Sequence, residues 1–399
     1  MAWPLRTWAA TMALGVYYTT DSLDPVAAQP SWTQLNTGLS NTDIISFCLD
    51  RHEDPADGRM FCIDNTTRTL WRRVIGDWSA VLTSAAARTL AGFVASEVLW
   101  SVTVDDITGY VYANLAELAA SSKVAVLRSI DHGNTWTAVV AISAAAFIYT
   151  ISNIDAYNGL VVFMRTRLIP GTVGHWYSVD HGATWSALGT SGLPAPLCAR
   201  INRAAGNYWY GNFGIAGVQY GLTRGNTAGA GANLWEVEQY GPQATAGGIW
   251  CDPLDANRSV SAAWAVNSIF VVTTDAFATI DSNNAISITY MHEIADCCEY
   301  GYWVQGCSLP VTPGRAPVYV STDGVTLGQK SGTNWETPPY TNAIPVTCGG
   351  IAGRGLWLVP GAPPVPPAPI LPPVPPFRPH AGQHGISMSV FKPRITLAP

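Results

Sequence analysis

The sequence of 399 residues has few charged side chains, and it lacks basic runs and long apolar runs. Charged residues make up 12% of the chain, about half of the ~25% that is usual in globular proteins. The formal net charge of −6 and the lack of a basic run leave no electrostatic surface for nucleic acid, so we expect no nucleic-acid partner. No stretch of ~18 residues is free of polar interruption, which argues against a membrane-spanning helix.

The eight cysteines form neither CxxC pairs nor zinc-finger spacings, so no metal site is predicted. Phosphate-binding glycine loops and nucleophile elbows are also lacking, and no cofactor is predicted. Cys48 and Cys62 lie on consecutive expected strands and form a candidate disulfide. The alternative is that they are small buried apolar residues.

The N-terminal segment has two interpretations. Arg6 followed by Thr7–Tyr18 has the outline of a short signal peptide, with a cleavage site at Val26-Ala27-Ala28. Two β-strands are the favoured interpretation, because Gly15–Asp21 matches the repeat described below.

Two octapeptides, at residues 129–136 and 178–185, have almost the same sequence. Both follow the pattern S-x-D-x-G-x-T-W, and the second begins 49 residues after the first. An Asp carboxylate can accept backbone N–H bonds in a tight turn, and Gly can adopt the positive φ that such a turn needs. The pattern therefore predicts a hairpin turn with a structural role, with the Trp indole packed under it. Its defining residues are Ser129, Asp131, Gly133, Thr135, Trp136, Ser178, Asp180, Gly182, Thr184 and Trp185.

The octapeptide resembles the Asp-box motif of sialidases and of other repeat proteins, such as sortilin-type receptors, xyloglucan hydrolases and photosystem assembly factors. The resemblance implies a β-propeller in which the Asp box closes a hairpin of each blade. Asp21 and Asp323 belong to two weaker copies, which we also interpret as structural.

Tryptophans and turn aspartates recur at intervals of roughly 50 residues, as expected for four-stranded propeller blades. The tryptophans that open the last strand of each unit are Trp32, Trp78, Trp136, Trp185, Trp235 and Trp335, and one is missing near residue 285. The turn residues that follow the first strands are Asp50, Asp105, Asp155, Asn202, Asp252 and Asp296. Both series predict an all-β fold, a seven-bladed β-propeller of four-stranded blades over residues 1–360.

The strands that close the propeller have alternative assignments. Ile344–Gly349 and Gly355–Val359 fit the first two strands of a blade that Gly15–Asp21 and Trp32–Asn36 complete. Pairing both termini in one blade removes exposed edges. Leu5–Thr11 also fits a second strand, so either it or Gly355–Val359 is extra, and eight blades are the alternative to seven.

Residues 361–399 differ in composition from the rest of the chain. Ala362–Pro379 is dominated by proline, which cannot join a central strand, so an extended polyproline II arm is predicted. Ile386–Leu397 alternates well enough to form one added strand. We expect the arm to contact a neighbouring subunit, which makes a homo-oligomer the expected state, and a flexible linker is the alternative. His380 and His384 are too isolated to indicate a metal site.

In the Asp-box family, active sites lie on the face opposite the Asp boxes. In this sequence the loops of that face contain few carboxylates: Asp43, Glu97 and Glu117. Glycoside hydrolysis usually needs two carboxylates ~5–10 Å apart, and the spacing shows no such pair. No catalytic residue is therefore predicted.

Several residues in or near these loops are candidates for binding. The segment Arg167-Leu168-Ile169-Pro170 faintly resembles the Arg-Ile-Pro motif of sialidases, but it has an extra residue and lies in the fourth unit instead of before the first Asp box. Aromatic side chains near the rim can stack on sugars or neighbouring proteins, although such residues are more often blade core. The candidates are Arg165, Arg167, His175, Trp176, Phe213 and Arg315.

Two functional hypotheses follow. The first is a non-enzymatic structural or binding propeller of an extracellular or viral assembly, exposed outside the cell or on a virion surface, with other protein subunits or a glycan as partners. Its low charge suits packing against other copies, since fewer ions need to be desolvated. The alternative is a glycoside hydrolase similar to sialidases or xyloglucan hydrolases. Two close carboxylates or three clustered arginines on the loop face would favour that alternative.

Overall fold

The computed structural model describes residues 6–11, 15–19, 33–50, 59–94, 96–105, 107–117, 123–143, 152–165 and 174–188, and the strands between residues 198 and 359. The chain divides into two units, Met1–Gly361 and Ala362–Pro399. All described residues belong to the first unit. The expected proline-rich arm, its terminal strand, His380 and His384 lie outside the described residues.

The described part of the chain is mostly β, as predicted, and its sheets are antiparallel with neighbouring strands in chain order. The first three complete sheets consist of β4 (Ile44–Leu49), β5 (Met60–Asp64), β6 (Leu70–Arg73) and β7 (Trp78–Leu82); of β8 (Glu97–Val104), β9 (Val111–Glu117), β10 (Lys123–Ser129) and β11 (Thr137–Ser143); and of β12 (Ser152–Tyr157), β13 (Leu160–Arg165), β14 (Gly174–Ser178) and β15 (Ser186–Leu188).

The later sheets follow the same plan. They consist of β16 (Cys198–Ala205), β17 (Tyr208–Ile215), β18 (Gln219–Asn226) and β19 (Trp235–Gly241); of β20 (Thr245–Cys251), β21 (Ser259–Trp264), β22 (Ser268–Thr273) and β23 (Asp281–Ile286); and of β24 (Met291–Cys297), β25 (Tyr302–Cys307) and β27 (Val318–Ser321). The short strand β26 (Gly314–Arg315) pairs with β28 (Pro345–Val346).

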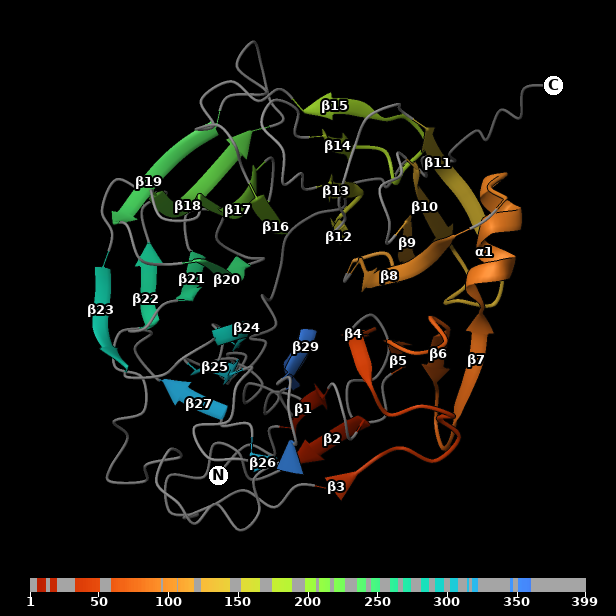
Figure 1. Ribbon diagram of the computed structural model, residues 1–399, viewed down its shortest axis with the longest axis horizontal. Coiled ribbons are helices and arrows are strands. Elements are labelled where there is room, and N and C mark those ends of the chain that lie inside the picture. The colour runs from red at the N-terminus through yellow and green to blue at the C-terminus, as the bar shows by residue number, and fades with distance from the viewer. Residues whose placement is uncertain are drawn as a thin grey trace, which may run out of the picture. The chain divides into compact units, whose positions relative to one another are not determined.

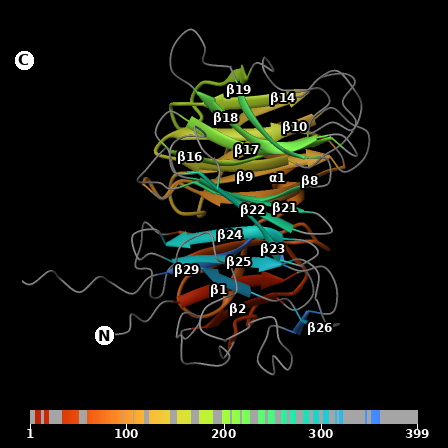
Figure 2. The ribbon, with the colours of Figure 1, turned by 90° about the vertical axis from the view of Figure 1, so that its left-hand side faces the viewer.

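Within the first unit the sheets are arranged radially, with the first strand of each sheet nearest the centre (Figure 1). Each first strand contacts the first strand of the next sheet, from β4 through β8, β12, β16 and β20 to β24. The view from the side shows the strands stacked across the unit (Figure 2). This arrangement buries both faces of a sheet, since each face meets a neighbouring sheet.

One sheet joins the two ends of the first unit. Its strand order is β29 (Ile351–Val359), β1 (Arg6–Thr11), β2 (Gly15–Thr19) and β3 (Thr33–Gln34). Strand β29 contacts both β24 and β4, so the cycle of first strands closes. The strand interpretation of the N-terminal segment is thereby confirmed for β1 and β2.

The predicted assignment of the closing strands is wrong in one respect. Gly355–Val359 is not a separate second strand but the second half of β29, and β1 is the second strand. Within Ile344–Gly349 the structure describes β28, which pairs with β26. Gly353 and Gly355 interrupt the apolar pattern of β29, so one long strand has the sequence pattern of two short ones.

The core lies between neighbouring sheets. All five residues of β5 are buried, which is expected for a strand covered on both faces. One apolar cluster extends over the closing sheet, the β4–β7 sheet and the β8–β11 sheet, and it includes Val16, Phe47, Phe61 and Leu99. A second cluster lies between the β8–β11 and β12–β15 sheets.

The candidate disulfide between Cys48 and Cys62 is wrong. Both residues are buried thiols that no disulfide links. In the β4–β5 ladder Cys48 lies opposite Phe61, and Cys62 lies opposite Phe47. Because neighbouring residues of a strand point to opposite faces, the two sulfur atoms lie on opposite faces of the sheet.

A helix, α1 (Ser84–Ala91), lies in the connection between β7 and β8. The Thr83 side chain caps its first turn by accepting from Ala86 N–H, and Gly92 ends it in the left-handed conformation. The helix contacts all four strands of the β8–β11 sheet. Among the described residues, no helix has both the length and the apolar character that a bilayer crossing requires.

Candidate functional site

The connections between strands lie at two opposite ends of each sheet, because successive strands are antiparallel. Connections from the first to the second strand and from the third to the fourth lie at one end, which we call the Asp-box end. Connections from the second to the third strand and from one sheet to the next lie at the opposite end, which we call the loop end.

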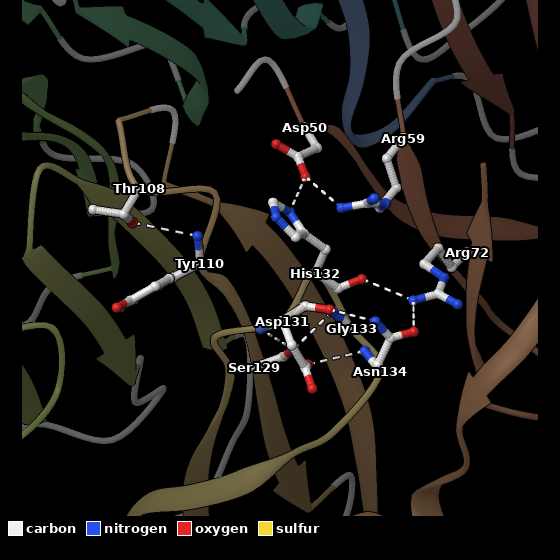
Figure 3. Close-up of polar contacts among 10 residues, drawn as sticks. All are labelled: Asp50, Arg59, Arg72, Thr108, Tyr110, Ser129, Asp131, His132, Gly133 and Asn134. Carbon is white, nitrogen blue, oxygen red and sulfur yellow. Dashed lines mark hydrogen bonds and ion pairs between the residues drawn. The ribbon is translucent and has the colours of Figure 1, made fainter. Parts of the chain in front are cut away.

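The first octapeptide forms the turn between β10 and β11, and its polar side chains bond to one another (Figure 3). The Asp131 carboxylate accepts the Thr135 N–H at 2.8 Å through Oδ1 and the Thr135 hydroxyl at 2.6 Å through Oδ2. Ser129 Oγ donates to Asp131 Oδ1 at 2.7 Å and accepts from Gly133 N–H at 2.7 Å. The aspartate therefore accepts both the backbone and the side-chain donor of Thr135 within its own turn.

The second octapeptide forms the turn between β14 and β15 with the same contacts. Asp180 accepts the Thr184 N–H at 2.8 Å and the Thr184 hydroxyl at 2.6 Å, while Ser178 Oγ donates to it at 2.7 Å. Trp185 Nε1 donates to Gly182 O at 2.9 Å. The indole therefore packs against the turn, as the sequence predicts.

Both turn carboxylates remain charged well below neutral pH. The hydroxyl and N–H of Thr184 are the main reason why the pKa of Asp180 falls from 3.8 to about 2. Around Asp131 burial acts to raise the pKa, but hydrogen bonds, chiefly from Thr135, outweigh it and bring that pKa to about 2 as well. A carboxylate held ionised by donors of its own turn suits a structural role and not that of a general acid.

The turn of the first octapeptide also contacts the preceding sheet through His132 (Figure 3). His132 Nδ1 lies 2.9 Å from Oδ2 of Asp50, which directly follows β4. The same oxygen accepts from Arg59 Nη1 at 3.3 Å. The Asp50 side chain is fully buried, so these two residues supply the partners that a buried carboxylate requires.

Two further contacts fix this turn on the β4–β7 sheet. Arg72 Nη1 donates to His132 O at 2.9 Å and to Asn134 Oδ1 at 2.6 Å. Gly133 has a φ of +84°, and a Cβ at this position would lie 2.7 Å from Cε1 of Phe61. Only glycine therefore fits between the turn and the aromatic ring. We call this set of contacts the first junction.

The turn of the second octapeptide contacts the β8–β11 sheet in the same way. His181 O accepts from Arg128 Nη1 at 2.6 Å and from Tyr112 Oη at 3.3 Å. Its Nδ1 lies 4.0 Å from Oδ2 of the buried Asp105. The arginine, the aromatic residue and the aspartate occupy the same strand positions as their counterparts in the first junction, so the arrangement is a repeated one.

Asp105 extends this second junction. Its carboxylate accepts the N–H groups of Asn158 at 2.9 Å and Gly159 at 2.8 Å, both in the turn between β12 and β13. It also accepts from Ile107 N–H in its own turn at 3.0 Å. This one buried side chain therefore bonds to turns of two neighbouring sheets.

The sequence analysis did not identify the two histidines as contact residues. The signal was present, because His132 and His181 occupy the same position in both octapeptides. Their partners are distant in sequence, and the separation between His132 and Asp50 is 82 residues. No spacing rule on one strand or one helix connects such residues.

The candidate binding residues do not come together in the described part of the chain. Trp176 is half-buried and packs against the cluster that includes Ile154 and Val161, in agreement with the blade-core alternative. Asp21, Arg167 and Asp323 lie outside the described residues. For the remaining candidates only the strand position is described: Arg165 in β13, His175 in β14, Phe213 in β17 and Arg315 in β26.

At the loop end, the register places two glutamates opposite each other that the sequence analysis had left apart. Glu97 of β8 lies directly opposite Glu117 of β9. Lys123 begins β10, and its Nζ lies 3.4 Å from Glu97 Oε1. Arg88 of α1 donates from Nη1 to Glu97 O at 2.6 Å. The Glu97 side chain is fully buried. We call these four residues the loop-end cluster.

A stacked pair lies nearby at the same end. The guanidinium of Arg68, from the turn between β5 and β6, lies 4.4 Å from the ring centroid of Trp100 in β8. Ser84 Oγ of α1 donates to Arg68 O at 2.7 Å and accepts from Leu99 N–H at 3.0 Å. Helix α1 therefore links the loop ends of the two sheets. No group of three or more His, Cys, Asp or Glu side chains suited to a metal ion occurs among the described residues.

Comparisons with known proteins identify the fold and not a family. No family model matches the chain, and no curated protein matches it in sequence. Among solved structures, a protein from Lactobacillus plantarum is similar with a TM-score of 0.57 and 12% identity, over 90% of this chain and 99% of that one. The GH74 xyloglucanase from Xanthomonas campestris is similar with a TM-score of 0.53 and 12% identity, over 90% of this chain and 52% of that one.

A third similar structure is a putative 6-phosphogluconolactonase from Bacteroides fragilis, with a TM-score of 0.51 and 10% identity, over 89% of this chain and 97% of that one. The chain is a β-propeller. Its radial sheets are blades, and the two junctions are contacts between successive blades. The chain spans about half the length of the xyloglucanase, and at these identities the likeness concerns the fold alone.

Proposed function

We propose that this propeller has seven blades with Asp-box-type repeats and acts as a structural and binding module, not as an enzyme. The cycle of first strands supports the blade count, because β29, β4, β8, β12, β16, β20 and β24 contact one another in that order and return to β29. The hydrogen bonds of the Asp131 and Asp180 turns support the Asp-box likeness.

The use of the carboxylates carries the non-enzymatic proposal. In the described part of the chain, most aspartates accept hydrogen bonds or ion pairs within turns and between blades: Asp50, Asp64, Asp105, Asp131, Asp155 and Asp180. A general acid or base must reach a substrate proton. Side chains already bound to the protein's own donors are poorly placed for that task, whereas they stiffen a scaffold.

We further propose an extracellular or virion-surface location, with other protein subunits and a glycan as partners. The low content of charged residues, 12%, supports packing against other proteins because few ions need to be desolvated. Ala362–Pro379 is the proposed arm, and it would contact another copy of the chain.

Sedimentation velocity tests this proposal. The full chain should sediment as an oligomer, and a chain ending at Gly361 should sediment as a monomer with an unchanged thermal melting curve. Equal sedimentation of the two chains would remove the arm from the proposal, and a monomeric full chain would remove self-assembly.

A glycoside hydrolase is the second candidate, and one observation favours it. Glu97 and Glu117 are directly opposite each other in the β8–β9 ladder, and opposite residues in a ladder have Cβ atoms about 4.5–5.5 Å apart. Retaining glycosidases hold two carboxyl groups about 5–5.5 Å apart, so two glutamates with neighbouring Cβ atoms are the backbone arrangement that such a pair requires. Release of reducing ends from xyloglucan by the purified chain, abolished in Glu97→Gln and in Glu117→Gln, would establish hydrolysis. No release would support the non-enzymatic proposal.

A further inference from the structure

The buried carboxylate of Glu97 lacks hydrogen-bond donors. Its side chain is fully buried, and in the described part of the chain neither Oε1 nor Oε2 has a hydrogen-bond partner. Lys123 Nζ, at 3.4 Å from Oε1, offsets the charge. An ionised carboxylate removed from water without donors is unfavourable. The two oxygens therefore point to donors other than those of the described residues.

The charges of the loop-end cluster indicate what kind of donor fits. Within this cluster the Glu97 carboxylate faces one ammonium, that of Lys123, so this ion pair is formally neutral. A charged ligand would leave one charge uncompensated in a partly buried site. A neutral ligand with hydroxyl groups supplies donors to the carboxylate and acceptors to the ammonium without changing this balance.

The segment that precedes Glu97 in the chain has features of a part that can rearrange. It joins α1 to β8 and contains Gly92 at a φ of +70° and Ser96 at +65°. A left-handed backbone is unfavourable for a residue other than glycine, and Ser96 directly precedes Glu97. Between them, Val94 is 88% exposed, and the Phe93 ring lies 5.6 Å from Lys123 Nζ. An aromatic ring is thus adjacent to the half-exposed ammonium.

We propose that Glu97, Lys123 and Phe93 form a binding site for a vicinal diol of a neutral carbohydrate. The carboxylate accepts two hydroxyl groups, the ammonium donates to a hydroxyl or ring oxygen, and the aromatic ring packs on the C–H face of the sugar. Movement of the described residues 92–94 and of Ser96, which directly precede Glu97, exposes the carboxylate to the ligand. This inference rests on the proposed binding function and specifies its ligand class and its site.

Isothermal titration of the full chain with cellotetraose and with maltotetraose tests the site. We expect saturable binding of at least one of them. Glu97→Gln preserves the size of the side chain but turns one acceptor into a donor, so affinity should fall about tenfold or more, as expected for the loss of a hydrogen bond to a charged group. Asp77→Asn makes the same charge change at an exposed position of the Asp-box end and should leave the affinity unchanged.

The double variant Glu97→Gln with Lys123→Met guards against a folding effect, since it removes both members of the ion pair. It should melt close to the parent chain and bind neither sugar. No saturable binding of either tetrasaccharide, or equal affinity of the parent chain and Glu97→Gln, overturns the site. The sedimentation experiment and the sugar titration test separate claims. If the chain does not self-assemble but binds a sugar, the binding site is retained. If the chain self-assembles but binds no sugar, the binding site alone is overturned.

Discussion

Replacing Gly133 with alanine tests whether the Asp-box turn packs directly on the preceding blade. An added Cβ would lie 2.7 Å from Cε1 and 3.3 Å from Cζ of Phe61, which is fully buried. A left-handed backbone costs a residue with a side chain about 1–2 kcal/mol, and an extra methyl group in a packed site costs a further ~1–3 kcal/mol. We therefore expect Gly133→Ala to lower the free energy of unfolding by about 2–5 kcal/mol.

Gly76 provides a matched control in the equivalent turn of the preceding blade, between β6 and β7. Its φ is +96°, but nothing lies within 4 Å of an added Cβ. Gly76→Ala should therefore cost only the backbone contribution, about 1–2 kcal/mol. The difference between the two variants, about 1–3 kcal/mol, measures the contact between the turn and the aromatic ring.

Urea denaturation followed by tryptophan fluorescence gives both values. In a chain that already carries Phe61→Leu, Gly133→Ala should lower the free energy of unfolding by less than it does in the parent chain. The reason is that leucine lacks the ring edge that the added Cβ meets. Equal losses for Gly133→Ala and Gly76→Ala would refute the reasoning, since the first junction would then contribute nothing beyond backbone strain.

Three other features allow similar tests. The folded-state pKa of Asp131 is about 2, below its ordinary 3.8, so its carboxylate stabilises the fold above roughly pH 4 and this contribution disappears as the pH falls towards 2. Asp131→Asn should therefore flatten the melting temperature between roughly pH 5 and pH 2. His132→Ala removes one of the partners of the buried Asp50 and should lower the free energy of unfolding by about 1–3 kcal/mol in urea denaturation. Cys48 and Cys62 should react with a thiol reagent only after unfolding, because both are buried and burial raises the pKa of Cys62.

Each of these expectations has a result that would contradict it. If the melting temperature of Asp131→Asn fell with decreasing pH as steeply as that of the parent chain, the hydrogen bonds of Asp131 would not stabilise the fold. A His132→Ala chain as stable as the parent would show that the imidazole does not support the buried carboxylate. Rapid labelling of both thiols in the folded chain would contradict the register of β4 and β5.

The periodic patterns of the sequence predicted the strands of the fold most reliably. Several of the tryptophans and turn aspartates mark the ends of strands, such as β4 before Asp50 and β11 after Trp136. They did so because a blade repeats one local pattern, and strand alternation and turn chemistry are readable over a few residues. The hydrogen bonds of the octapeptides are equally local, and their acceptor role followed from the residue types. The turn positions predicted at Asp155, Asn202 and Asp296 are wrong, because these residues lie within β12, β16 and β24.

Features that depend on register or on distant contacts were not predictable in the same way. A shift of one residue in the β4–β5 ladder exchanges the faces of all its side chains, and this decides whether Cys48 meets Cys62 or Phe61. Similarly, Glu97 and Glu117 became a pair only once their ladder was known. Helix α1 was missed because a short alanine-rich stretch in a connection has no strong period of its own.

The closing blade has a consequence for how the ring responds to cleavage. Three of its strands come from the beginning of the chain, and its innermost strand is β29, the last strand of the ring. A protease that trims the chain back to Val359 would leave every blade intact. Removal of the nine residues of β29 would take away the one strand that contacts both β24 and β4, so the circle would become an open arc. A cut of a few residues there would therefore have a larger effect than the loss of the whole C-terminal unit.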